Sequence, residues 1–169
     1  MRWLRIAPVL VSAFFALSAG PVRSEQQPEA NAAFAKLSGL VGTWKRAETS
    51  GSQLSIDFEL TANNTVLVER WMHAGTMHSL TVYHLDGEAL MATHYCPQGN
   101  QPRLKMAAGT VADRIVFEFH DATNLQHIDE SHQHRLSFDL ADMKRVIRGE
   151  VYRQGKSKSE TEMTLVRIP

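Results

Sequence analysis

Apolar and polar residues alternate with a period of two from residue 43 to the end of the chain. Successive side chains of a strand point to opposite faces, so this alternation predicts half-buried β-strands. Turn sequences rich in glycine, asparagine and aspartate separate the segments, and Asp86-Gly87 is the strongest hairpin signal. The predicted strands are residues 43–49, 53–61, 65–73, 76–85, 88–96, 103–108, 114–120, 132–140, 144–153 and 160–168.

About ten short strands joined by tight turns predict an all-β fold with a single antiparallel, up-and-down sheet. We expect this sheet to close into a barrel, because closure removes the exposed strand edges. Ahead of it, residues 31–41 carry apolar residues at helical spacing, which predicts one short N-terminal helix that ends at Gly42. We therefore expect a lead-in and helix over residues 25–41 and one barrel domain over residues 42–169.

The first 24 residues have the three parts of a secretory signal peptide. A basic segment at residues 2–5 precedes an apolar stretch that is too short to span a bilayer, and Val22 and Ser24 are small residues at the expected cleavage site. We expect cleavage before Glu25 and export of the mature protein, which makes it periplasmic or secreted. An uncleaved N-terminal anchor is the alternative.

The composition argues against several classes of partner and site. The chain has 18 basic and 18 acidic residues, and its first 24 residues contain three arginines and no acid. The mature chain is therefore slightly acidic, which argues against nucleic acids and anionic membranes as partners. A single cysteine excludes internal disulfides and Cys-rich zinc sites. We expect Cys96 to be buried, with a disulfide between two chains as the alternative.

Residues 42–44, Gly-Thr-Trp, stand at the start of the alternating segments and resemble the G-x-W opening of lipocalins and other calycins. This resemblance implies that Trp44 closes one end of a calycin-like barrel beneath an arginine of the last strand, which is Arg167 here. The stretch THYCPQGNQPR at residues 93–103, together with residues 68–87, is similar to a group of exported, lipocalin-like proteins. The similarity covers most of the mature chain and implies the fold but no activity.

Strand pairing groups polar side chains on the predicted sheet. Two-residue turns at residues 74–75 and 86–87 set the register, and opposed residues share a face. On that register one face carries Leu67, Glu69, Trp71, His78, Leu80, Val82, Met91, Thr93 and Tyr95. We expect this face to point inward and to bury Glu69 near His78 and Tyr95. The alternative inner cluster consists of Arg70, Ser79 and His94.

Two further groups of polar residues are candidate binding elements. Asn100 and Arg103 lie in a loop rich in hydrogen-bonding side chains and are suited to hold a carboxylate or an amide at the barrel mouth. His132 and His134 point the same way on a strand, so both can reach one metal ion. The candidates for a third metal ligand are Glu118, His120 and His94. The alternative for the first group is that Asn100 only holds the turn and Arg103 is solvated. The alternative for the second group is that His132 and His134 are two polar residues at the open mouth of the barrel.

These observations predict a barrel that binds a small amphipathic organic ligand without catalysis and without a cofactor. The predicted ligand-binding residues are Glu69, His78, His94, Tyr95, Asn100 and Arg103. A metal-binding protein or enzyme that uses His132 and His134 is one alternative. A structural or interaction barrel whose interior is filled by side chains is the other. The predicted core consists of Trp44, Phe58, Trp71, Leu80, Val82, Ile115, Phe117, Phe119, Leu136, Phe138 and Leu165.

Overall fold

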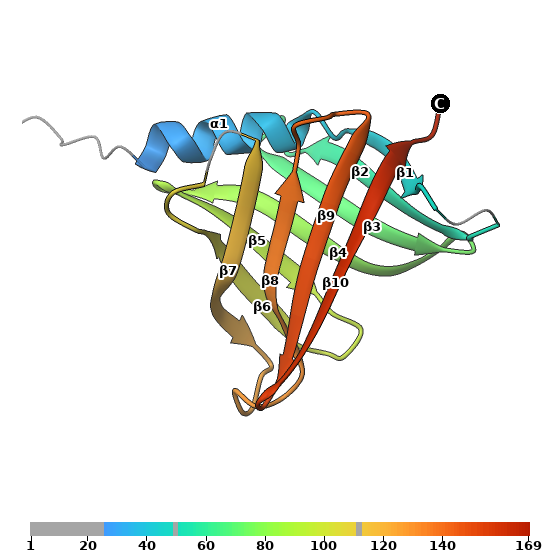
Figure 1. The fold of residues 1–169 in the computed structure, drawn as a ribbon. Helices are drawn as coiled ribbons and strands as arrows, with labels where there is room; N and C mark the ends of the chain where they lie inside the picture. The colour runs from blue at the N-terminus through green and yellow to red at the C-terminus, as the bar shows by residue number, and fades with distance from the viewer. Residues whose placement is uncertain (1–25, 49–50, 111–112) are drawn as a thin grey trace, which may run out of the picture.

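The computed structural model describes residues 26–48, 51–110 and 113–169, which form a closed antiparallel β-barrel of ten strands (Figure 1). Each strand pairs with its neighbours in sequence, and the last strand pairs with the first, so the barrel has the predicted up-and-down topology. The strands are β1 (Gly42–Arg46), β2 (Leu54–Thr61), β3 (Val66–His73), β4 (Thr76–Asp86), β5 (Ala89–Tyr95), β6 (Gln101–Met106), β7 (Arg114–Thr123), β8 (His132–Asp139), β9 (Arg145–Gln154) and β10 (Ser157–Arg167). The predicted signal peptide lies outside the described residues.

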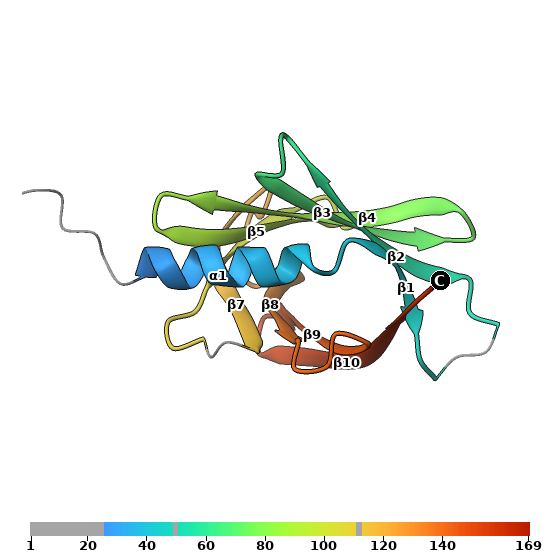
Figure 2. The ribbon, with the colours of Figure 1, turned by 90° about the horizontal axis from the view of Figure 1, so that it is seen from above.

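The predicted N-terminal helix is present as α1 (Gln26–Ser38), which begins and ends earlier than the sequence predicts. Backbone amides of Gly39 and Leu40 bond to carbonyls three residues back, so a tight turn ends the helix before Gly42 is reached. The helix lies along one end of the barrel (Figure 2), and its Leu37 side chain is fully buried there. No helix in the described part of the chain is long and apolar enough to cross a membrane.

Trp44 of β1 is fully buried at the same end of the barrel as the helix. Its indole nitrogen donates to the Leu40 carbonyl over 2.7 Å, and the Arg167 guanidinium of β10 lies 4.7 Å from the centre of its ring. Arg167 also donates to two carbonyls of the turn between α1 and β1. A Cβ atom at Gly42 would lie 2.7 Å from the guanidinium, so a glycine is needed for this contact.

The register of β4 and β5 differs from the predicted one. Leu80 pairs with Tyr95 and Leu85 pairs with Leu90, which is a shift of two residues, and the turn falls on residues 87–88. Because side chains alternate with a period of two, a shift of two residues changes the cross-strand partners but keeps every side chain on its predicted face.

A β-bulge between Trp71 and Met72 changes the register of β3 and β4 more severely. The two-residue turn lies where the sequence predicts it, but beyond the bulge Glu69 pairs with Thr81 instead of Leu80. A bulge inserts one extra residue into one strand. Beyond it, the β4 side chains that share a face of the sheet with Glu69 are therefore those of Thr81 and Tyr83, and not those of Leu80 and Val82. The predicted cross-strand partners of Glu69 are therefore wrong.

Large aromatic side chains pack together inside the barrel. The Tyr83 ring lies 5.7 Å from Phe117 and 6.1 Å from Phe138, measured between ring centres, and Phe58 lies 6.4 Å from Phe138. The predicted core residues that are buried are Trp44, Phe58, Ile115, Phe117, Leu136, Phe138 and Leu165. These side chains come from strands all around the sheet, so one continuous core stabilises the closed barrel.

The prediction that Leu80 and Val82 belong to the core is wrong. The fully buried residues of this part of β4 are Thr81 and Tyr83, and Leu80 and Val82, which alternate with them, are only partly buried on the outer face. The same bulge at residues 71–72 explains the error, since it reverses which face of β4 accompanies the inward residues of β3. The predicted core residues that are half-buried are Trp71 and Phe119.

Candidate functional site

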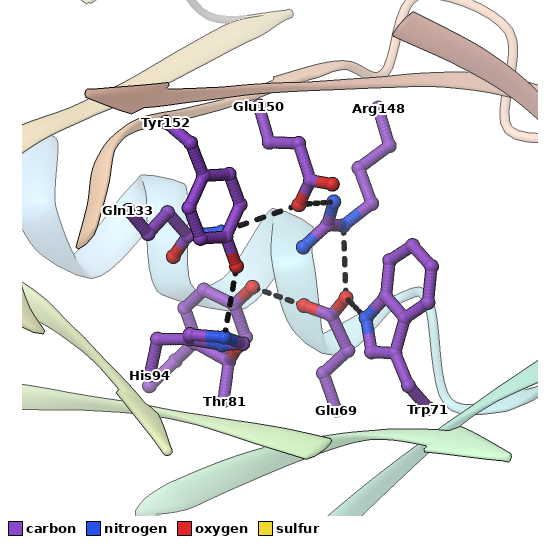
Figure 3. A network of polar contacts seen from close by, with 9 residues as sticks. Glu69, Trp71, Thr81, His94, Gln133, Arg148, Glu150 and Tyr152 are labelled. Carbon is purple, nitrogen blue, oxygen red and sulfur yellow. Dashed lines mark hydrogen bonds and ion pairs between the residues drawn. The ribbon is translucent and has the colours of Figure 1, made fainter. Parts of the chain in front are cut away.

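A network of polar side chains crosses the barrel interior, with Glu69 of β3 at its centre (Figure 3). The carboxylate accepts hydrogen bonds from the Trp71 indole nitrogen, over 2.6 Å, and from the Tyr83 hydroxyl. Its Oε1 atom lies 2.8 Å from Nε of Arg148, and neither of these two side chains has exposed surface. Burial of a charged group is very costly unless it is paired and hydrogen-bonded, and these partners meet that requirement.

Arg148 of β9 lies between two carboxylates. Its Nη1 atom donates to Oε2 of Glu150 over 2.9 Å, and the Gln133 amide donates to the same oxygen over 3.3 Å. The guanidinium also lies 4.7 Å from the centre of the Trp71 ring, which is a cation–π contact. Burial alone lowers the pKa of Arg148, but Glu69 and Glu150 outweigh burial and raise the pKa above its ordinary value. The arginine is therefore a permanent buried cation.

His94 of β5 and Tyr152 of β9 form the other end of the network. His94 Nδ1 lies 3.0 Å from the Thr81 hydroxyl, and His94 Nε2 lies 3.2 Å from the Tyr152 hydroxyl. Burial and the Arg148 charge lower the pKa of His94 to about 4, so the ring is neutral at pH 7. Burial and the nearby Glu150 raise the pKa of Tyr152, so its hydroxyl keeps its proton. Both rings are uncharged groups that donate and accept hydrogen bonds.

Three buried atoms of the network have no hydrogen-bond partner among the residues that the structure describes: Nε and Nη2 of Arg148 and Oε1 of Gln133. Nε lies in the ion pair with Glu69, so the atoms with neither kind of partner are Nη2, which is a donor, and Oε1, which is an acceptor. Figure 3 shows that the free end of the guanidinium points into the region between Glu69 and Tyr152. A buried polar atom without a partner costs about 1–3 kcal/mol, so such atoms indicate a bound water or ligand. This donor and acceptor define the candidate binding site.

Two loops meet at the barrel end opposite α1, and Asn100 joins them. Asn100 lies in the loop between β5 and β6, and its amide donates over 2.8 Å to the Ser131 carbonyl in the loop between β7 and β8. Asn124 makes a longer bond of 3.4 Å from the second loop to the Gly99 carbonyl. Asn100 is nearly buried, and its Oδ1 atom has no partner in the described chain. The residue therefore lies at the predicted barrel mouth and connects its loops.

The other predicted ligand-binding residues lie away from the interior network. His78 is exposed on β4, and Tyr95 at the end of β5 has 49% of its surface exposed. Arg103 of β6 makes a two-pronged contact with Asp121 on the exposed surface, and this contact lowers the pKa of Asp121. Of the predicted ligand-binding residues, the structure therefore places Glu69 and His94 in the interior network, and it leaves His78 and Tyr95 outside it.

His132 and His134 lie next to each other at the start of β8 and belong to a series of hydrogen bonds that runs from Arg153 to Glu130. Arg153 donates to His134 Nε2 over 3.3 Å, His134 Nδ1 lies 3.3 Å from His132 Nε2, and His132 Nδ1 lies 2.8 Å from the Glu130 carbonyl. An arginine can only donate and a carbonyl can only accept, so we assign both rings as neutral with the proton on Nδ1. Burial and then the Arg153 charge lower the pKa of His134, which agrees with a neutral ring.

This chain of contacts occupies the nitrogen lone pairs that a metal ion would need. Each Nε2 atom of the two histidines already accepts a hydrogen bond, and each Nδ1 carries a proton. Within the described residues, no group of three or more His, Cys, Asp or Glu side chains is placed to hold a metal. Of the candidates for a third ligand, His94 lies in the interior network, and Glu118 and His120 are exposed on β7.

The residues that β8 and β9 supply to the network are not among the predicted site residues. Arg148, Glu150 and Tyr152 occupy alternate positions of β9 on the same face as the fully buried Val146. This alternation is a signal in the sequence that could have placed them inside. No such signal exists for Gln133, because it turns inward at a bulge in β8 that the residue pattern does not reveal.

A scan of protein-family models and a search of curated proteins give no match to this chain. The chemistry of the site therefore follows from its own residues: one buried cation between two carboxylates, a free donor, a free acceptor and two neutral rings. Such a set of groups orients a polar partner by hydrogen bonds, while the surrounding aromatic side chains offer apolar contact.

Proposed function

We propose that this protein binds a small amphipathic organic molecule inside its barrel and catalyses no reaction on it. The observation that carries the proposal is the buried pair of free atoms, Arg148 Nη2 and Gln133 Oε1. A ligand whose polar end accepts from the arginine and donates to the glutamine satisfies both atoms. The apolar contacts for the rest of the ligand are supplied by core residues such as Leu104, Phe117 and Phe138.

The charges of the network favour a polar end that is uncharged. Arg148 already contacts the carboxylates of Glu69 and Glu150 at 2.8 and 2.9 Å, so its charge is balanced before a ligand binds. An ionised acid would add a third carboxylate to one cation, and a buried charge without its own partner is costly. A primary amide both donates and accepts without a charge, so it suits the two free atoms.

The proposal includes the type of barrel and its location. The contact of Trp44 with Arg167 supports a calycin-like barrel, because the lipocalin resemblance implies this packing at one barrel end. The first 24 residues support export, which would place a one-domain mature protein in the periplasm or outside the cell. A binding protein in such a place would meet small molecules outside the cytoplasm, and nucleic acids and membranes are not its proposed partners.

A calorimetric titration with decanamide, decanol and decanoate tests the proposal. Decanamide is expected to bind with one molecule per chain and to raise the melting temperature, and decanoate is expected to bind more weakly. Tyr152→Phe removes one hydroxyl from the network and Gln133→Met removes the amide with its free acceptor, and each should weaken decanamide binding about tenfold, the effect of one hydrogen bond. Tyr95→Phe makes the same chemical change on the surface and should leave the affinity unchanged.

A barrel filled by its own side chains is the second candidate, and the tight interior supports it. The side chains of Trp44, Tyr83, Phe117, Phe138 and Arg148 are all essentially without exposed surface. Side chains commonly fill the interior of small barrels. On this account the two free atoms hold water, no compound of the decane series binds, and the melting temperature does not respond to any of them.

A further inference from the structure

A pocket on the outer face of the barrel is separate from the interior network. It has a volume of about 260 Å³. Its lining residues come from β7, β8, β9 and β10, strands that follow one another around the sheet (Figure 1). Its lining residues are Glu118, Phe119, His134, Arg135, Val151 and Lys158. Nothing in the proposed interior function uses these side chains.

The pocket forms where β7 and β8 separate. The two strands pair only between residues 114–118 and 135–139, and beyond that point β7 follows β6 while β8 follows β9. Phe119 is the first residue of β7 past the paired part, and His134 lies at the bulge of β8. Their rings stack with centres 5.6 Å apart and form one wall of the pocket.

Opposite charges face this pocket without pairing with each other. Glu118 and Arg135 are directly opposed on β7 and β8, yet no ion pair joins them in the described part of the chain. The Nε atom of Arg135 is also buried without a hydrogen-bond partner. Lys158 adds a second cation at the pocket, although it lies 2.9 Å from Glu160. The Arg135 charge acts on Glu160 and the Glu118 charge on His134, but no ion pair in the described part of the chain holds Arg135 or Glu118, so both are available to a ligand.

An apolar surface lies between these charges. Val151 is on the outer face of β9, because Arg148 and Glu150 take the inward positions, yet only 4% of Val151 is exposed. Together with the Phe119 ring it gives the pocket apolar contact area. The volume is below the roughly 300–1,000 Å³ of pockets for drug-sized ligands, so the occupant must be smaller than these.

We propose that this outer pocket binds a free α-amino acid with an apolar side chain. Arg135 takes the carboxylate, since a guanidinium binds a carboxylate through two parallel hydrogen bonds. Glu118 takes the ammonium group, and the side chain of the ligand packs on Phe119 and Val151. The two charges of an amino acid are needed to satisfy both protein charges, which distinguishes this ligand class from a simple carboxylic acid or amine.

An NMR titration of the purified protein with L-phenylalanine tests this proposal. Backbone amide shifts are expected at residues 118–119, 134–135 and 151, and 3-phenylpropionate and phenethylamine, which each lack one charge, should bind at least about fivefold more weakly. Arg135→Gln and Glu118→Gln should each weaken L-phenylalanine binding by about tenfold. Arg145→Gln and Glu48→Gln change exposed residues elsewhere and serve as matched controls.

Three results would overturn the proposal. The first is the absence of shifts at the pocket at saturating L-phenylalanine, and the second is equal affinity for 3-phenylpropionate. The third is binding that is unchanged in Arg135→Gln. Tyr152→Phe, which alters only the interior network, should leave this titration unchanged, so the outer site is tested independently of the interior one.

Discussion

Among single residues, Arg148 has the largest expected effect on stability, because its loss leaves the Glu69 carboxylate buried without a cation. Removing one partner of a buried ion pair costs about 3–5 kcal/mol, and we expect Arg148→Met to lower the free energy of unfolding by this amount. Urea unfolding followed by circular dichroism measures the change. The double variant Glu69→Gln/Arg148→Met should regain more than half of the loss, since it removes the uncompensated charge.

A double variant as unstable as Arg148→Met alone would contradict this explanation. In that case the packing of the guanidinium on Trp71 and Phe138, which lie 4.7 and 5.8 Å away, would dominate its contribution. A separate Trp71→Leu variant would then show a loss similar to that of Arg148→Met, because it removes the closer of these contacts.

His94 makes the free energy of unfolding depend on pH below neutrality. Its pKa is about 4 in the folded protein and about 6.5 in the unfolded chain, so the unfolded chain binds the proton first as the pH falls. The stabilisation is fully present above pH 6.5 and is lost as the pH falls to 4. Between pH 7 and pH 4.5 the natural protein should lose roughly 2 kcal/mol more stability than His94→Gln.

Chemical denaturation of both proteins at several pH values measures this difference. The glutamine variant can still bond to Thr81 and Tyr152 but has no titrating ring, so acidic groups elsewhere affect both proteins equally. Stability curves that run parallel for the two proteins across this pH range would show that His94 is not the group responsible.

At the residue scale the sequence predicts some of the buried polar positions but not their partners. The alternation of β3 predicts that Glu69 points inward, and the structure confirms its burial. Its contact with Arg148 joins strands that are distant in the sequence, so no local pattern indicates it. Regular pairing of β3 with β4 predicts that His78 lies on the face of Glu69, but the bulge opposite Trp71 and Met72 leaves His78 unpaired in the ladder and exposed.

At the scale of elements, α1 contributes to stability by burying its inner face against the end of the barrel. Leu37 is fully buried there, so Leu37→Ala should lower the free energy of unfolding by about 2–5 kcal/mol, the usual cost of a cavity in a core. Val41, which is 40% exposed, is the matched control, and Val41→Ala should change stability by less than about 1 kcal/mol. Equal effects of the two substitutions would mean that the helix does not pack as described.

The existence of the elements could be predicted because it depends on local patterns. Each of the ten predicted strands is present, with ends displaced by a few residues, since alternation is a property of neighbouring residues. Register could not be predicted in the same way. It depends on the bulges in β4, β7 and β8 and on which two residues form each turn, and these are set by contacts across the sheet.

For the whole molecule, the closure of the second barrel end depends on the loops that Asn100 connects. Asn100→Ala removes the hydrogen bond to the Ser131 carbonyl. We expect faster hydrogen exchange at residues 124–131, with a loss of about 1 kcal/mol in global stability, the usual contribution of one hydrogen bond. Hydrogen exchange read by mass spectrometry measures the effect. Unchanged exchange in this loop would show that the bond does not hold the barrel end closed.

We propose that the polar network inside the barrel holds a small organic ligand. The most direct measurement is a high-resolution crystal structure of the untagged protein purified from its natural host, with native mass spectrometry of the same sample. We expect connected density larger than a water molecule beside Arg148 Nη2 and Gln133 Oε1, with a matching added mass. Isolated waters at these two atoms and the mass of the bare polypeptide would contradict it and would identify a barrel filled by its own side chains.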